Sequence, residues 1–143
     1  METRNITIDE ALDLIARGES HFWDFKSSMS GGKVIQKIGC AFANGDGGEF
    51  LVGVEDSKVG SGFDRWKGFE SLERGNHIMQ SLSGEVSPPV PYAAEWLQVV
   101  GHESAGFACL VSIRKSPVVH ETADGIVYVR QNASTAKVDG AER

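Results

Sequence analysis

The chain has 143 residues, of which 41% are hydrophobic and 24% are charged, and its formal net charge is −6. This length and balance predict one soluble globular domain with a sizeable core. No apolar run approaches the roughly 20 residues that a membrane helix needs, and the first residues lack a secretory pattern, so we expect a cytoplasmic protein with no membrane partner. The two cysteines, Cys40 and Cys109, favour free thiols over a disulfide framework.

The N-terminal part predicts a helix followed by a strand. Thr7 and Glu10 have the spacing of a capping box, so we expect a helix over residues 8–17 that ends before Gly18. The aromatic run over residues 21–26 is typical of a strand.

The middle of the chain predicts a second helix and a second strand. Apolar residues recur at helical spacing over residues 33–43, and Asn44 with the glycines after it suits a helix end and a tight turn. A nearly continuous apolar run then predicts a buried strand over residues 49–54. Because these glycines follow a helix instead of opening one, they do not form the usual phosphate-binding loop. The remaining predicted elements are a helix over residues 70–82, strands over 94–100, 107–113 and 126–130, and a polar tail over 131–143.

Three carboxylates stand near the ends of the first two predicted strands: Glu19, Asp24 and Asp56. If the intervening helix packs back on both strands, these ends meet and form a site for a hard divalent cation, Mg²⁺ or Mn²⁺, that would serve phosphodiester cleavage. Glu19 and Asp24 have opposite strand parity, so they converge only if Glu19 lies in the turn before the strand or a bulge intervenes. Lys26 shares the strand face of Asp24 and would meet the phosphate.

Two lysines of the second predicted helix, Lys33 and Lys37, lie one turn apart and away from its apolar stripe. They form either a solvated helix face or a short basic ridge that contacts phosphate. The four histidines show no metal-ligand spacing with Cys40 or Cys109, so no zinc site is expected. Both cysteines are interpreted as small buried hydrophobic residues.

The runs ESHFWDFK, AFAN, GGEFLVGVED and YVRQNAST, in this order, resemble the Schlafen AlbA-type domain. That family shows an acid, a second acid followed by an aromatic residue and Lys, then AFAN before two glycines, a G-V-x-D strand end, and Y-x-R with small hydroxyl residues. The resemblance covers residues 19–135 and leaves a helix in 1–18 and a tail in 136–143. It implies a single α/β (α+β) domain over 1–143, with a mixed sheet flanked by about three helices.

The resemblance also implies nucleic-acid binding, and in some members ATP binding. In animal Schlafen proteins the three acids form a metal-dependent endoribonuclease site that acts on tRNA and rRNA, and they correspond here to Glu19, Asp24 and Asp56. Asp24 stands where the family more often has Glu. Animal Schlafens join two such lobes around a positively lined groove, and a homodimer of this chain could rebuild it.

Our main hypothesis is therefore an endoribonuclease that cuts structured RNA such as tRNA with Mg²⁺ or Mn²⁺. Lys26 would meet the phosphate, and Lys33, Lys37 and Arg130 would be weaker contacts to the nucleic acid. The alternative is a non-catalytic module that binds DNA or RNA, in which the carboxylates are incidental. Recognition or folding would then depend on Tyr128, Arg130, Ser134 and Thr135. A third alternative, nucleotide binding, rests on the resemblance alone.

Overall fold

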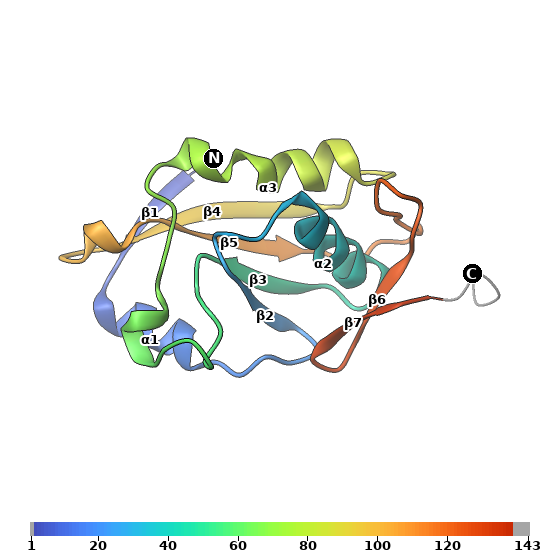
Figure 1. The fold of residues 1–143 in the computed structure, drawn as a ribbon. Coiled ribbons are helices and arrows are strands. Elements are labelled where there is room, and N and C mark those ends of the chain that lie inside the picture. Colours follow the sequence, from blue (N-terminus) through green and yellow to red (C-terminus); the bar gives the residue numbers. More distant parts are fainter. Residues whose placement is uncertain (1, 139–143) are drawn as a thin grey trace.

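A five-stranded mixed sheet forms the centre of the computed structural model, which describes residues 2–138 (Figure 1). Its strand order is β1-β4-β5-β3-β2, and the bounds are β1 Glu2–Ile6, β2 Trp23–Lys26, β3 Gly48–Val52, β4 Tyr92–Val99 and β5 Ala108–Ile113. β1 runs parallel to β4 and β2 parallel to β3, whereas β5 is antiparallel to both of its neighbours. The predicted mixed α/β fold is confirmed.

Helical segments pack on both faces of this sheet. The first face is covered by α2 (Gly32–Asn44) and by a continuous helical stretch of η2 (Leu72–Gly75), α3 (Asn76–Gln80) and the π-helical turn η3 (Ser81–Glu85). The second face is covered at one end by α1 (Ile8–Ala16) and η1 (Gly62–Arg65). A short turn, η4 (Glu103–Ala105), lies in the connection between β4 and β5. Among residues 2–138, no helix has the length and apolar character needed to cross a membrane.

The alternation along β2 determines which of its side chains enter the site. Trp23 and Phe25 belong to the hydrophobic cluster on the α1 side of the sheet. Because neighbouring residues of a strand point to opposite faces, Asp24 and Lys26 point to the side that α2 covers. The capping box expected at the start of α1 is confirmed: the Glu10 amide donates to Thr7 Oγ1 (3.1 Å), and the Thr7 amide donates to Glu10 Oε1 (3.2 Å).

A second, two-stranded sheet is formed by β6 (Tyr128–Gln131) and β7 (Ser134–Lys137). The end of α2 holds it in place, since Asn44 Nδ2 donates to the carbonyls of His120 and Tyr128, both at 2.9 Å. Asn132 takes a left-handed backbone conformation (φ 55°) in the turn that joins the two strands. Asn tolerates this conformation well, which suits it to a tight hairpin turn.

The structure corrects three sequence-based expectations. Residues 134–137, predicted within a polar tail, form β7, because the Asn132 turn folds them back on β6; residues 139–143 of that tail lie outside the described part. Residues 2–6 form β1, which its mostly polar sequence did not reveal, since β1 gains its strand conformation by pairing with β4. The helix predicted over residues 70–82 is divided into η2, α3 and η3, with Gly75 at the first junction.

Candidate functional site

A tight turn before β2 brings Glu19 back beside Asp24. The Ser20 amide donates to the Trp23 carbonyl (2.9 Å), and the Phe22 amide donates to Ser20 Oγ (3.2 Å). Glu19 directly precedes this turn and lies outside the strand, and its carboxyl group shares a hydrogen bond with that of Asp24. Because the two acids have opposite strand parity, they could meet only if Glu19 lay before the strand or a bulge intervened. The structure has the first of these arrangements.

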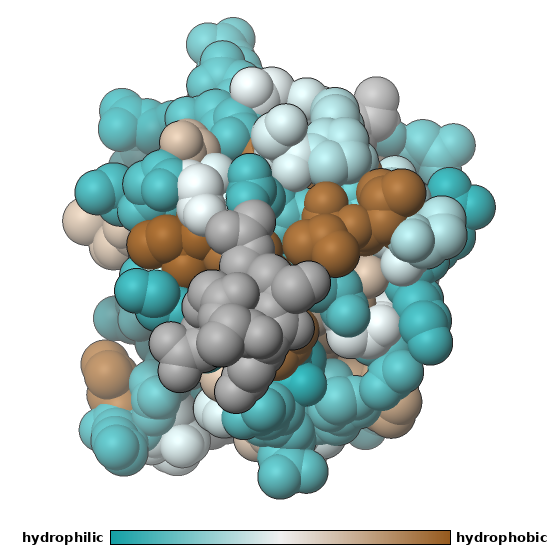
Figure 2. Space-filling model, turned by 90° about the vertical axis from the view of Figure 1, so that its right-hand side faces the viewer, coloured by the Kyte–Doolittle hydropathy of each residue, from teal (hydrophilic) through white to brown (hydrophobic). Residues whose placement is uncertain are grey.

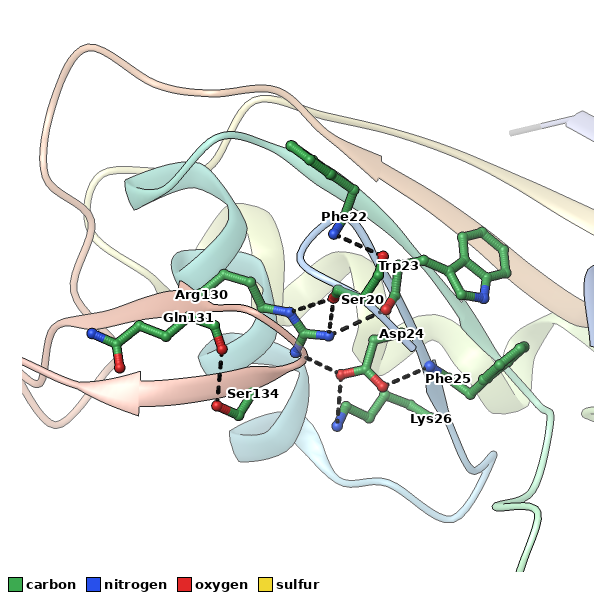
Figure 3. A network of polar contacts seen from close by, with 9 residues as sticks. All are labelled: Ser20, Phe22, Trp23, Asp24, Phe25, Lys26, Arg130, Gln131 and Ser134. Carbon is green, nitrogen blue, oxygen red and sulfur yellow. Dashed lines mark hydrogen bonds and ion pairs between the residues drawn. The ribbon is translucent and has the colours of Figure 1, made fainter. Parts of the chain in front are cut away.

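Asp24 is almost completely buried and is held from three directions (Figure 3). Its Oδ1 accepts a hydrogen bond from the Phe25 amide at 2.7 Å. Its Oδ2 accepts one from Arg130 Nη1 at 2.9 Å, and Lys26 Nζ lies 3.5 Å from the same oxygen. A buried carboxylate needs such partners, because burial without them strongly disfavours its charge.

The guanidinium of Arg130 connects the β6–β7 sheet to the turn that follows Glu19. Its Nη2 donates to the carbonyls of Ser20 (2.8 Å) and Trp23 (3.2 Å), and its Nε donates to the Ser20 carbonyl (3.2 Å). Its central carbon also lies 5.1 Å from the centre of the Phe42 ring. The Arg130 side chain is only 1% exposed, so in this structure it acts as an internal tether and does not present its charge to a ligand.

Glu19 and Asp24 share one proton between their carboxyl groups. The hydrogen bond to Asp24, followed by burial and the charges of Asp24 and Asp56, raises the pKa of Glu19 to about 7, although Lys26 opposes this shift. Burial alone would raise the pKa of Asp24. The hydrogen bond from Glu19 and the charges of Lys26 and Arg130 outweigh burial and lower the Asp24 pKa. The proton of the pair therefore resides on Glu19.

A pocket of about 440 Å³ opens beside this pair. Glu19, Lys26 and Asp56 are among its lining residues, so the residues before the turn, the end of β2 and the segment after β3 meet there. Asp24 lies buried beside Glu19 and does not itself line the pocket. The charge of Asp56 is close enough to raise the pKa of Glu19.

Three further charged residues, which the predicted site did not include, line the same pocket: Arg17, Glu55 and Arg65. Arg65 Nε donates to the Glu55 carbonyl (2.8 Å), and Ser27 Oγ donates to Glu55 Oε1 (3.1 Å). Glu55 directly precedes Asp56 in the sequence, and this adjacency could have predicted that Glu55 lies at the site. Nothing in the spacing of Arg17 or Arg65 indicated that they lie at the site.

The two lysines of α2 lie along a different part of the surface. Lys33 and Lys37 are both exposed, and the charges of both reach Asp124. Lys37 Nζ lies 5.5 Å from the centre of the Tyr128 ring. These lysines therefore face the segment that precedes and begins β6, and they do not line the pocket that contains Glu19.

The donor atoms of the site suit a hard divalent cation, but their arrangement does not form a ligand cage. Carboxylate oxygens are the ligands that Mg²⁺ and Mn²⁺ prefer. Within residues 2–138, however, no group of three or more His, Cys, Asp or Glu side chains is placed to hold a metal ion. Of the three acids, Asp24 is the one whose side chain is buried. Its oxygens contact the Phe25 amide, Lys26 and Arg130.

A second cavity, also about 440 Å³, lies between the β6–β7 sheet and the segment before it. It is lined mainly by valines, including Val118, Val119 and Val129. Figure 2 shows hydrophobic patches within a largely hydrophilic surface on this side of the molecule. None of its lining residues has an acidic or basic side chain, so we propose no reaction in this cavity.

The fold and the pocket define a small α/β domain in which an acidic turn is tied to a C-terminal hairpin by a buried ion pair. The chain belongs to the Schlafen AlbA_2 family, whose model matches residues 19–139. This match confirms the expected family resemblance. It includes the three acids and the whole β6–β7 sheet.

Two solved structures share the fold. The DIP2311 protein from Corynebacterium diphtheriae has a TM-score of 0.59 and 17% identity, over 94% of this chain and 26% of that protein. The N-terminal domain of a RecG-related protein from Nitrosomonas europaea has a TM-score of 0.56 and 22% identity, over 77% of this chain and 74% of that one. This chain thus spans about a quarter of the Corynebacterium protein. No curated protein matches the chain.

Proposed function

We propose that this chain is a nucleic-acid-binding domain and that the pocket beside Glu19 is an endoribonuclease site for structured RNA such as tRNA. The observation that supports this proposal is that Glu19 lies beside the buried Asp24 and lines the same pocket as Asp56. Membership of the Schlafen AlbA_2 family and the fold shared with a domain of a DNA-helicase-related protein agree with a role on nucleic acid.

The residues of the pocket could serve phosphodiester cleavage in distinct ways. Glu19 lines the pocket, and its ionised carboxylate could bind a divalent cation. Lys26 lines the pocket with its side chain 27% exposed, and its charge could stabilise the phosphate. The proposed Mg²⁺ or Mn²⁺ would lower the pKa of a bound water and neutralise charge on the phosphate. Glu19 and Asp56, which line the pocket, would hold it, with the buried Asp24 beside Glu19 as the third acid.

Outside the pocket, Lys33 and Lys37 are proposed as further contacts to the nucleic acid. Both are exposed on α2, where they could neutralise backbone phosphates. Two copies of the chain could form a longer groove around one substrate. The bound strand is proposed to be RNA, and DNA is the alternative that binding experiments must test.

The second candidate function is a non-catalytic module that binds DNA or RNA. The contacts of Asp24 favour it, because a buried carboxylate bound by Arg130, Lys26 and the Phe25 amide acts as a structural anchor. Nucleotide binding through the glycine turn has no geometric support. The turn Gly45–Gly48 follows the end of α2, whereas a phosphate site of the usual kind uses the start of a helix.

The test compares cleavage and binding by the same protein preparations. Labelled tRNA and single-stranded DNA are incubated with wild-type protein, Glu19→Gln, Asp56→Ala and a control, Glu73→Gln, in Mn²⁺, Mg²⁺ or EDTA. The proposal expects metal-dependent cleavage of tRNA that both pocket variants lose and the control keeps. Mn²⁺ should also broaden the NMR signals of Glu19 and Asp56 in the wild-type protein.

Other outcomes separate the alternatives. Binding without cleavage by the wild-type protein would support the non-catalytic module. Cleavage that persists in both pocket variants would indicate another site or a contaminant. A wild-type protein that neither binds nor cleaves would contradict both candidate functions.

A further inference from the structure

An aromatic side chain stands exposed just before β2, at the end of the strand away from Lys26. Phe22 is 55% exposed, whereas its neighbours Trp23 and Phe25 are 5% and 9% exposed. An exposed ring offers a π-face on which a nucleic-acid base can stack. The catalytic proposal above gives Phe22 no role.

The backbone and the neighbouring ring hold Phe22 in a fixed position. Its amide donates to Ser20 Oγ (3.2 Å), and its carbonyl accepts from the Glu49 amide (2.9 Å). The His21 ring meets the Phe22 ring edge-on, with 4.7 Å between the ring centres. His21 is held in turn, since its Nε2 donates to Asp46 Oδ2 at 2.7 Å. A ring whose main chain is held in this way loses less conformational entropy on binding than a ring on a free loop.

Two cationic side chains come from the segment that follows β5, at the same end of the sheet. Lys115 Nζ lies 3.8 Å from Asp46 Oδ1 and is 69% exposed, and Arg114 beside it is also exposed. The backbone there is closely packed: a Cβ on Gly47 would lie only 2.9 Å from the Ile113 carbonyl and 3.0 Å from the Lys115 amide. The Asp46–Gly47 turn thus links the Phe22 turn to the two cations.

We propose that Phe22 is a stacking platform for an unpaired nucleic-acid base, and that Lys115 and Arg114 bind the phosphates next to that base. This inference rests on the proposed nucleic-acid binding, and it adds a subsite specific for single-stranded segments. Aromatic stacking tolerates any base, and adjacent cations follow the backbone, which is the usual combination in single-strand binding sites. Phe22 and Lys26 are four residues apart, about 13 Å along a strand, so one substrate could reach both the platform and the pocket.

The experiment measures the affinity of a short single-stranded RNA and of an RNA duplex of the same length by fluorescence anisotropy. The variants are Phe22→Ala, Phe22→Leu, Phe22→Trp and Lys115→Ala. Val100→Ala is the matched control, because Val100 is also 55% exposed but lies in the connection between β4 and β5. Thermal unfolding of each variant shows whether its fold is retained, and sedimentation shows its oligomeric state.

The platform predicts a pattern that only base stacking produces. Phe22→Ala and Phe22→Leu should weaken single-strand binding by roughly tenfold to a hundredfold, whereas Phe22→Trp and Val100→Ala should bind like the wild type. The affinity for the RNA duplex should change little in the Phe22 variants and in Val100→Ala, because paired bases cannot reach the ring. Lys115→Ala should lower the slope of log affinity against log salt by about one.

The results that would contradict the stacking platform can be distinguished from a failure of the proposed nucleic-acid binding. If the wild type binds RNA and Phe22→Ala binds it equally well, the platform is wrong and nucleic-acid binding stands. If Phe22→Ala affects only self-association, the ring serves a protein contact and the platform is again wrong. If the wild type binds no nucleic acid, the proposed function fails and the platform fails with it.

Discussion

Arg130 and Asp24 lie 106 residues apart in the chain, yet Arg130 Nη1 donates to Asp24 Oδ2 at 2.9 Å inside the protein. Both side chains are nearly completely buried, at 1% and 3% exposed. The same guanidinium binds the carbonyls of Ser20 and Trp23, so it fixes the turn that places Glu19 beside Asp24. This one contact therefore contributes both to the stability of the fold and to the geometry of the candidate site.

Replacement of Arg130 by alanine is expected to lower the free energy of unfolding by about 3–5 kcal/mol, because Asp24 would lose its closest cation while remaining buried. Chemical denaturation measures this change. Arg4→Ala is the matched control, since its pair with Glu95 is also short (2.8 Å) but its side chain is 50% exposed. That pair should contribute less than about 1 kcal/mol. Equal losses in the two variants would show that Arg130 does not stabilise the fold through its buried pair.

The hydrogen bond between Glu19 and Asp24 predicts a dependence of stability on pH. The Glu19 pKa of about 7 lies above its ordinary value of 4.5, so its contribution to stability is complete below pH 4.5 and is lost as the pH rises toward 7. Glutamine at position 19 keeps a donor for Asp24 at every pH. Glu19→Gln should therefore remove the part of the stability loss that wild type shows between pH 4.5 and 7.

Denaturation midpoints across this pH range give the measurement, with Glu73→Gln as the surface control. The control should keep the wild-type dependence. The contribution of Asp24 to stability changes with pH in the opposite direction. Because the pKa of Asp24 is lowered, this contribution is present above the ordinary pKa of 3.8 and is lost as the pH falls through the lowered pKa. A Glu19→Gln protein with an unchanged slope between pH 4.5 and 7 would contradict the proposed sharing of the proton.

Gly75, at the junction of η2 and α3, is expected to tolerate no side chain. A Cβ at this position would lie 2.2 Å from the ring of Trp96, which is buried in the core. Gly75→Ala should therefore destabilise the protein by about 1–3 kcal/mol through overpacking. Gly84 lies in the same helical stretch and has no atom within 4 Å of such a Cβ, so Gly84→Ala serves as the control. A loss of stability in the control as large as that in Gly75→Ala would point to helix backbone effects instead.

The two cysteines should resist thiol reagents as long as the protein is folded. Burial, with a smaller contribution from nearby acidic charge, raises the pKa of both Cys40 and Cys109 to about 12. The thiolate is the reactive form, so at neutral pH it is nearly absent in the native state. Labelling with a thiol reagent should follow global unfolding in denaturant. Fast labelling of either residue without denaturant would show that it opens locally.

Much of the site's composition could be inferred from the sequence, because it depends on local pattern. The ESHFWDFK run identified Glu19, Asp24 and the strand β2, and the apolar stripe over residues 33–43 matches the core of α2. The capping residues of α1 were equally clear. The role of Arg130 could not be predicted in this way, since the arginine of a Y-x-R run is equally compatible with a surface contact to nucleic acid and with an internal tether.

The sequence alone thus identified the acids of the site and most of the elements that carry them, since short-range spacing indicates helices, strands and turns. The tertiary structure decided which distant groups meet. It placed Asp56 within the electrostatic reach of Glu19, buried Arg130 against Asp24, and paired β1 with β4 and β7 with β6. These contacts depend on long-range packing and on the desolvation of charge, and neither is encoded in the spacing of residues along the chain.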